Sequence, residues 1–215
     1  MLCPEGSLGK RSLEQLHSTV MDKQVGVISD THGLLRPEAV AALASVDLIV
    51  HAGDIGSAEL LEALAAVAPV LAVRGNNDRE PWAVSLPETV TTEIAGIRLY
   101  VVHDLKTLPK PPEQLGADVV ISGHSHKPSV ERRSGTLLLN PGSAGPRRFT
   151  LPIAIARLRV GPSGPRAEIV ELDVSARPAG PRRARRGGAR DLRSGGLDGA
   201  KGRGAVSPRG RMRAR

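Results

Sequence analysis

The strongest constraint on the fold is a regular alternation of two hydrophobic patterns in the first half of the chain. Residues 24–29, 47–52 and 69–75 are short apolar runs with the length of buried strands. Between them, residues 36–46 and 57–67 carry apolar side chains at helical spacing. The first of these segments has a proline in its opening turn, and Ser57 is a suitable N-cap for the second. The alternation predicts a parallel sheet covered by helices.

From residue 89 onwards the pattern changes to strands joined by turns that contain glycine. The predicted strands are 89–96, 97–103, 118–123, 129–135, 136–140, 153–160 and 167–173. Together with the first half, they predict an α/β fold. We expect a four-layer α/β/β/α sandwich, in which two mixed β-sheets pack face to face and helices flank them.

The charges divide the chain into zones. Residues 177–215 hold 13 of the 30 Lys and Arg residues and only two of the 22 acidic residues, so the basicity belongs to this tail. We predict a disordered extension over 1–22, one domain over 23–175 and a disordered Arg/Gly-rich tail over 176–215. A solvated tail is the favoured interpretation, and nonspecific contact with nucleic acid is the alternative.

The remaining composition bounds the cellular setting. The chain has no apolar run long enough to span a membrane and no pattern of a secretion signal, so we expect a cytoplasmic protein without a membrane partner. Its single cysteine, Cys3, permits no internal disulfide and no thiolate metal cluster. The oligomeric state stays open.

Polar side chains of the metal-binding type follow the predicted strands. Each group comes directly after an apolar run, and in α/β sheets the carboxyl ends of strands form the ligand crevice. Each residue alone is a weak signal, because a strand-end aspartate or asparagine is usually turn chemistry. The ordered set predicts a shared metal site. Its members are Asp30, His32, Asp54, Asn76, His103, His124 and His126.

The motifs ISDTHG, VHAGD, RGNND, SGHSH and LNPGS, in this order, resemble the calcineurin-like metallophosphoesterase superfamily. The resemblance covers about residues 23–175 and is closest to the small bacterial and archaeal phosphodiesterase branch (YfcE-like). It implies two divalent metal ions. Asp30, His32 and His126 would hold one, Asn76, His103 and His124 would hold the other, and Asp54 would bridge them.

The resemblance also implies hydrolysis of a small phosphodiester by a hydroxide that bridges the two ions and attacks phosphorus in line. Imidazole, carboxylate and amide ligands without sulfur suit manganese, nickel, iron, cobalt or zinc, and we expect manganese first. Asp54, Asn77 and Asp78 are the predicted catalytic residues.

Two positions depart from the family pattern. Many members have histidine where this chain has Asn77, and an amide cannot act as a general acid near neutral pH. We therefore expect modest turnover and a preference for activated leaving groups. Asp104 follows His103 where glycine is frequent in relatives, and it is expected to narrow the mouth of the pocket.

Several nearby residues have two interpretations. His51 is either a strand-end histidine bonded to backbone or a support for a metal ligand. Asp78 either braces the turn at 75–78 or orients Asn76. Asn140 and Ser143 are expected in a tight turn, and Arg36 is expected to be exposed.

Two other functions compete with the phosphodiesterase. The same fold serves as a non-catalytic scaffold in the retromer coat, where metal-ligand residues have been replaced. In this chain, all seven positions have residues that can bind a metal ion. A nuclease is the other alternative. Against it, the domain is slightly acidic and Trp82, Tyr100 and Phe149 are its only aromatic residues, so neither a basic groove nor a stacking platform is evident.

Overall fold

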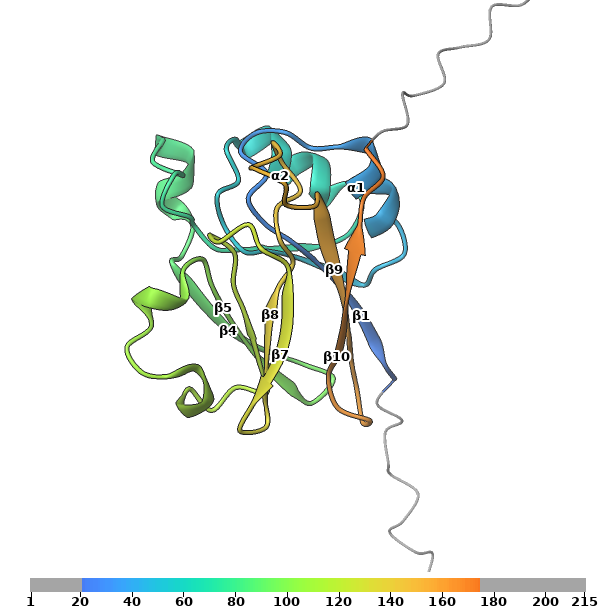
Figure 1. Cartoon of the computed structure of the whole chain (residues 1–215), viewed down its shortest axis with the longest axis vertical. Helices are drawn as coiled ribbons and strands as arrows, with labels where there is room; N and C mark the ends of the chain where they lie inside the picture. The colour runs from blue at the N-terminus through green and yellow to red at the C-terminus, as the bar shows by residue number, and fades with distance from the viewer. Residues whose placement is uncertain (1–20, 175–215) are drawn as a thin grey trace, which may run out of the picture. The chain divides into compact units, whose positions relative to one another are not determined.

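The computed structural model describes residues 21–174, so the predicted extensions at both ends lie outside the described residues except for Met21 and Asp22. These residues form two five-stranded sheets, seen in Figure 1 as two groups of arrows. The first sheet has the order β10 (Arg166–Glu171), β9 (Ala154–Val160), β1 (Lys23–Ile28), β2 (Leu48–His51) and β3 (Val70–Ala72). The second has the order β4 (Thr89–Ile94), β5 (Ile97–Val102), β6 (Val119–Ile121), β8 (Thr136–Asn140) and β7 (Ser129–Arg133).

Both sheets are mixed, as predicted. In the first, β1, β2 and β3 run parallel, which confirms the interpretation of the strand–helix alternation, and β9 and β10 add antiparallel to β1. In the second, β5, β6 and β8 are parallel, and the edge strands β4 and β7 are antiparallel to their neighbours. Each sheet therefore has a block of parallel strands whose carboxyl ends lie at one edge.

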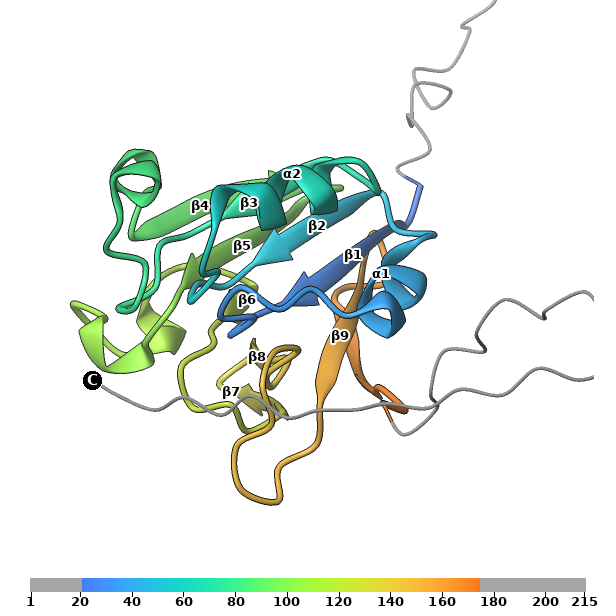
Figure 2. The same cartoon turned by 90° about the horizontal axis from the view of Figure 1, so that it is seen from above.

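The two α-helices pack on the first sheet. They are α1 (Pro37–Leu43) and α2 (Ala58–Ala65), both shorter than the predicted segments. The α1 helix contacts β9 and α2 contacts β3, and Figure 2 shows α2 lying along β2 and β3. The Ser57 hydroxyl accepts a hydrogen bond from the Leu60 amide at 3.3 Å, which is the predicted N-cap.

The second sheet carries a thinner outer layer. The 3-10 helix Pro112–Gln114 contacts β8 on this side. The other described 3-10 helices are Leu105–Thr107 and Pro81–Ser85, and Trp82 of the latter packs against the cluster under the α-helices of the first sheet. A small apolar cluster of Val120, Leu138 and Leu115 lies on this side. No helix among residues 21–174 is long and apolar enough to cross a membrane.

Two hydrophobic layers hold the sandwich together. Alternate residues of each strand point to opposite faces of a sheet. Val25 and Val27 of β1 therefore pack between the sheets against residues such as Leu99 and Ile121, whereas Ile28 packs under the helices. All five side chains are fully buried, and each contributes roughly 1.5–3 kcal/mol of transfer free energy. This packing fixes one sheet against the other and so positions the loops at their shared edge.

Candidate metal centre

The structure brings all seven predicted metal-site residues together from loops that follow five strands. Asp30 and His32 follow β1, Asp54 follows β2 and Asn76 follows β3; His103 follows β5, and His124 and His126 follow β6. Asp54 lies between the groups, because its Oδ2 is 3.9 Å from His32 Nε2 and 3.4 Å from His103 Nε2. Both sheets thus contribute side chains to one cluster.

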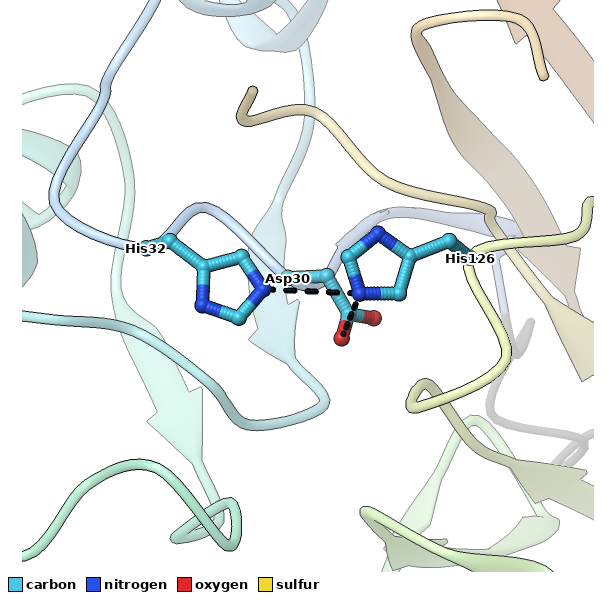
Figure 3. Close-up of side chains that lie close together, drawn as sticks. All are labelled: Asp30, His32 and His126. Atoms are coloured by element: carbon cyan, nitrogen blue, oxygen red, sulfur yellow. Dashed lines mark hydrogen bonds and ion pairs between the residues drawn. The ribbon is translucent and has the colours of Figure 1, made fainter. Parts of the chain in front are cut away.

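The first group of potential ligands consists of Asp30, His32 and His126, shown in Figure 3. The two imidazole rings are stacked with 5.3 Å between centroids, and their Nε2 atoms lie 3.4 Å apart. His126 Nε2 is 3.2 Å from Asp30 Oδ1, a fully buried oxygen that has no hydrogen-bond partner. A buried polar atom without a partner is costly unless another group satisfies it. Three electron-pair donors converging here fit a divalent cation.

The second group consists of Asp30, Asp54 and His103, whose ligand atoms lie within 4.8 Å of one another. His103 Nδ1 donates a hydrogen bond to the Ala52 carbonyl at 2.7 Å, which leaves the lone pair of a neutral ring on Nε2. That Nε2 faces two oxygens, Asp54 Oδ2 at 3.4 Å and Asn76 Oδ1 at 3.1 Å. A carbonyl bond that directs the second nitrogen into a site is typical of metal-binding histidines.

The grouping differs in detail from the prediction. Asn76 and His103 lie together as expected, and His124 Nδ1 is 3.0 Å from Asn76 Oδ1. However, Asp30 belongs to both groups of potential ligands, whereas the prediction assigned it to one metal only. The carboxylate of Asp30 is therefore central to the cluster.

The electrostatics of the cluster favour a charged Asp54. Burial acts to raise the pKa of its carboxyl, but the neighbouring His103 and hydrogen bonds from the Asn77 backbone and side chain hold that pKa well below its usual range. The Asn77 amide and side chain lie 2.9 Å and 2.6 Å from the two carboxylate oxygens. Burial lowers the pKa of His32 despite the attraction of Asp54. Burial also opposes protonation of His103, but bonds to Asp54 and Ala52 raise its pKa.

The backbone of these loops is unusual. Five of the seven residues have left-handed φ angles: Asp30 54°, His32 47°, Asp54 55°, His124 65° and His126 57°. This region is sparsely populated by residues other than glycine and costs roughly 1–2 kcal/mol per residue. Such conformations cluster at functional sites, where the surrounding structure enforces them. The sequence gives no direct signal of this geometry.

Two glycines allow the loops to approach closely. A Cβ atom on Gly123 would overlap Ser29 Oγ and lie 2.8 Å from Asp30 Oδ2. A Cβ atom on Gly75 would overlap the Asp54 amide and carboxylate. At both positions the lack of a side chain is needed for two strand-end loops to meet.

Asp78, predicted as catalytic, directs its carboxylate at backbone amides. Its Oδ1 accepts hydrogen bonds from Ile55 at 2.9 Å and Gly56 at 3.0 Å, and its Oδ2 accepts one from Gly75 at 2.8 Å. The side chain is buried. These contacts favour the bracing role, which ties the loop of Asp54 to the loop of Asn76.

His51 joins two loops without entering the cluster. Its Nδ1 accepts a hydrogen bond from the Gly53 amide at 3.2 Å, so Nε2 carries the proton and donates to Thr31 Oγ1 at 2.9 Å. Thr31 in turn donates to the Ile55 carbonyl at 2.9 Å. Complete burial lowers the pKa of His51 to about 4, so the ring is neutral. Both interpretations of His51 hold in part, because it bonds backbone and supports loops that carry Asp30 and Asp54.

The residues after β8 hold the same loops from the other side. Asn140 Nδ2 donates to the Gly123 carbonyl at 2.6 Å, and Ser143 Oγ donates to the Asp30 carbonyl at 2.8 Å. The expectation that Arg36 is exposed is wrong, because the side chain is half-buried. Its guanidinium donates hydrogen bonds to the Gly145 carbonyl from Nε at 3.3 Å and from Nη2 at 3.1 Å. The sequence prediction missed Thr31 as a supporting residue, although it lies within the ISDTHG motif.

Residues 24–161 match the model of the calcineurin-like phosphoesterase superfamily domain. A probable metallophosphoesterase of Methanothermobacter thermautotrophicus is 40% identical over 158 residues, which cover 68% of this chain and 91% of that protein.

Solved structures share the fold at low identity. An archaeal phosphodiesterase has a TM-score of 0.59 at 24% identity and covers 68% of this chain and 99% of its own. YfcE, a phosphoesterase of E. coli, has a TM-score of 0.52 at 22% identity, covering 70% of this chain and 100% of its own. Vacuolar protein sorting 29 of Cryptosporidium parvum has a TM-score of 0.57 at 21% identity, and the match covers 70% of this chain and 98% of that protein. The chain belongs to the calcineurin-like phosphoesterase superfamily, and its relatives include small archaeal and bacterial metallophosphoesterases.

Proposed function

We propose that the protein is a metal-dependent phosphoesterase that acts on small phosphodiesters. The single observation that carries the proposal is the buried Asp30 carboxylate, which is shared by two groups of potential ligands. Its unpartnered oxygen faces His126, and the lone pair of His103 faces two further oxygens. Two cations would satisfy donors that otherwise repel one another.

The donor set fits borderline transition metals. It combines two carboxylates, an amide oxygen and four imidazoles, with no sulfur. We propose manganese first, with nickel, iron, cobalt or zinc as alternatives. When bound, two divalent ions supply Lewis acidity and a water acidic enough to serve as a nucleophile near neutral pH.

The chain's own residues orient this chemistry. The low pKa of Asp54 keeps its carboxylate charged, as a metal ligand would need to be, and the Asn77 side chain holds it in place at 2.6 Å. Since an amide donates a hydrogen bond but no proton near neutral pH, Asn77 gives little help to a poor leaving group. Activated diesters are therefore the expected substrates in the laboratory.

The scaffold hypothesis makes a different prediction. The likeness to vacuolar protein sorting 29 concerns the fold alone, at 21% identity. A scaffold does not need converging ligands, whereas this chain keeps all seven within the cluster. A scaffold would be inert with every metal.

The test is chelation followed by addition of single metals. Hydrolysis of bis(p-nitrophenyl) phosphate and p-nitrophenyl phosphate is measured for the chelated protein and after adding manganese, nickel, iron, cobalt, zinc or magnesium. We expect diester hydrolysis to return, with manganese first, and to be lost in Asp54→Asn. Asp118→Asn changes an exposed carboxylate just before β6; it is the matched control and should keep full activity. Inertness of the wild type with every metal would move the protein to the scaffold class.

A further inference from the structure

A pocket of about 230 Å³ adjoins the candidate metal centre on the side of the second sheet. Three of its lining residues, Asn76, His103 and His124, belong to the candidate metal centre. We call the lining side chains that the proposed function does not use the outer wall: Arg74, Glu88, Val102, Asp104 and Thr107. A substrate held at the centre would place one of its substituents or charges beside these side chains.

The charges of the outer wall do not cancel. Arg74 Nη2 forms an ion pair with Glu88 Oε1, so these two residues offset each other. Asp104 forms no ion pair with a lysine or arginine among the described residues, and His124 Nε2 lies 3.6 Å from Asp104 Oδ2. Apart from the centre itself, Asp104 therefore gives the pocket one unbalanced negative charge.

The position of this charge is fixed by local structure. Asp104 caps the 3-10 helix Leu105–Thr107, and its Oδ1 accepts a hydrogen bond from the Lys106 amide at 3.0 Å. Thr107 Oγ1 donates to the Asp104 carbonyl at 2.8 Å. One carboxylate oxygen is thus tied to the turn, and the other faces His124 at the edge of the centre.

We propose that Asp104 is a specificity-determining residue that disfavours phosphomonoesters relative to phosphodiesters. The proposal rests on the proposed function. A monoester carries a second negative charge above a pKa of about 6, whereas a diester carries only one. If that extra charge were bound roughly 7 Å from the Asp104 carboxylate, an effective dielectric constant of 20 to 80 would give a discrimination of roughly three- to fiftyfold.

The experiment compares kcat/KM for p-nitrophenyl phosphate and bis(p-nitrophenyl) phosphate at pH 8 in the metal-reconstituted protein. In Asp104→Asn the monoester-to-diester ratio should rise by about tenfold, within the range set by Coulomb's law. Asp104→Glu, which restores the charge, should return the ratio towards that of the wild type. Glu93→Gln removes the same charge at the hairpin end of β4 and β5, remote from His103, and should leave the ratio unchanged.

A second readout separates charge from mere positioning. At a pH below the second pKa of the monoester, most of it carries one charge, so Asp104→Asn should change the ratio much less there than at pH 8. Inhibition of diester hydrolysis by inorganic phosphate, a dianion at pH 8, should strengthen in Asp104→Asn, whereas inhibition by dimethyl phosphate should not.

The outcomes distinguish the two proposals. Equal changes in both activities, with an unchanged ratio at both pH values, would overturn the role of Asp104 while leaving the phosphoesterase intact. A wild type that is inert with every metal overturns the proposed function instead. In that case, equal binding of inorganic phosphate by metal-treated wild type and Asp104→Asn, measured by calorimetry, would overturn the electrostatic role as well.

Discussion

Replacing Asp78 tests whether this buried carboxylate braces the centre or takes part in the chemistry. In Asp78→Asn the remaining oxygen can keep the bonds to the Ile55 and Gly56 amides, but the new NH₂ group opposes the Gly75 amide. A bond to a charged acceptor contributes roughly 1.5–3 kcal/mol, and a buried unsatisfied amide costs roughly 1–3 kcal/mol. We expect Asp78→Asn to lower the free energy of unfolding by about 2–4 kcal/mol.

Asp78→Ala removes all three hydrogen bonds that the carboxylate accepts. It should lower the free energy of unfolding by about 4–6 kcal/mol, which is a large part of the total stability of a domain. The measurement is urea unfolding of the chelated protein, combined with calorimetry of manganese binding. Metal affinity should also fall, because Asp54 and Asn76 lie on the two loops that Asp78 joins.

Asp118→Asn is the matched control for this series. Asp118 Oδ2 also accepts a backbone hydrogen bond, from Arg98 at 2.8 Å, but its side chain is 42% exposed. Asp118→Asn should lower the free energy of unfolding by less than about 1 kcal/mol, because water can replace the lost hydrogen bond. The bracing account is wrong if Asp78→Asn unfolds within about 0.5 kcal/mol of the wild type. Lost turnover with unchanged stability and metal affinity would instead place Asp78 in the reaction.

Three further predictions address single positions. Gly123→Ala should weaken manganese binding strongly and destabilise the fold by about 1–3 kcal/mol, because its Cβ displaces the Asp30 loop. Gly135→Ala meets no neighbouring atom but strains a φ of 91°, so it should lower stability while leaving manganese binding in calorimetry unchanged. The folded pKa of His51, about 4, lies below its unfolded value, so its contribution is present above pH 6.5 and is lost as pH falls towards 4. Urea unfolding should show that loss, up to about 3 kcal/mol, reduced in His51→Gln. Asn77→His should raise kcat/KM for diesters with alkyl leaving groups at least roughly tenfold, and an unchanged substrate profile would contradict the leaving-group account.

The order of elements could be predicted because each strand and helix has its own local period. Residues 24–75 indicated three parallel strands, and the structure has them as β1, β2 and β3. The neighbours of later strands could not be read in the same way. A period of two marks a strand but does not say that β9 pairs with β1, which lies more than a hundred residues earlier. Helix ends were also overestimated, because the apolar spacing continues past Leu43 into a turn.

The site was predictable to the level of residue types and strand ends. Ligand-type residues after neighbouring parallel strands of one sheet must meet at one edge, and this rule explains why Asp30 and Asp54 lie together. The packing of the second sheet against the first then adds His103 and His126 to the cluster. The direction of each side chain depends on backbone angles and on close loop contacts, neither of which has a local sequence signal. The sharing of Asp30 between two groups and the inward turn of Asp78 towards amides therefore required coordinates.

The origin of the potential ligands from both sheets has a mechanical consequence. Four of the seven side chains follow strands of the first sheet and three follow strands of the second. A bound pair of ions would therefore cross-link the two sheets at one end of the sandwich. Each sheet keeps its own ladder of hydrogen bonds without the ions. Removing the ions should therefore weaken the contact between the two sheets before the hydrogen bonds between strands open. Hydrogen exchange should then increase first in the loops after β2, β3 and β6.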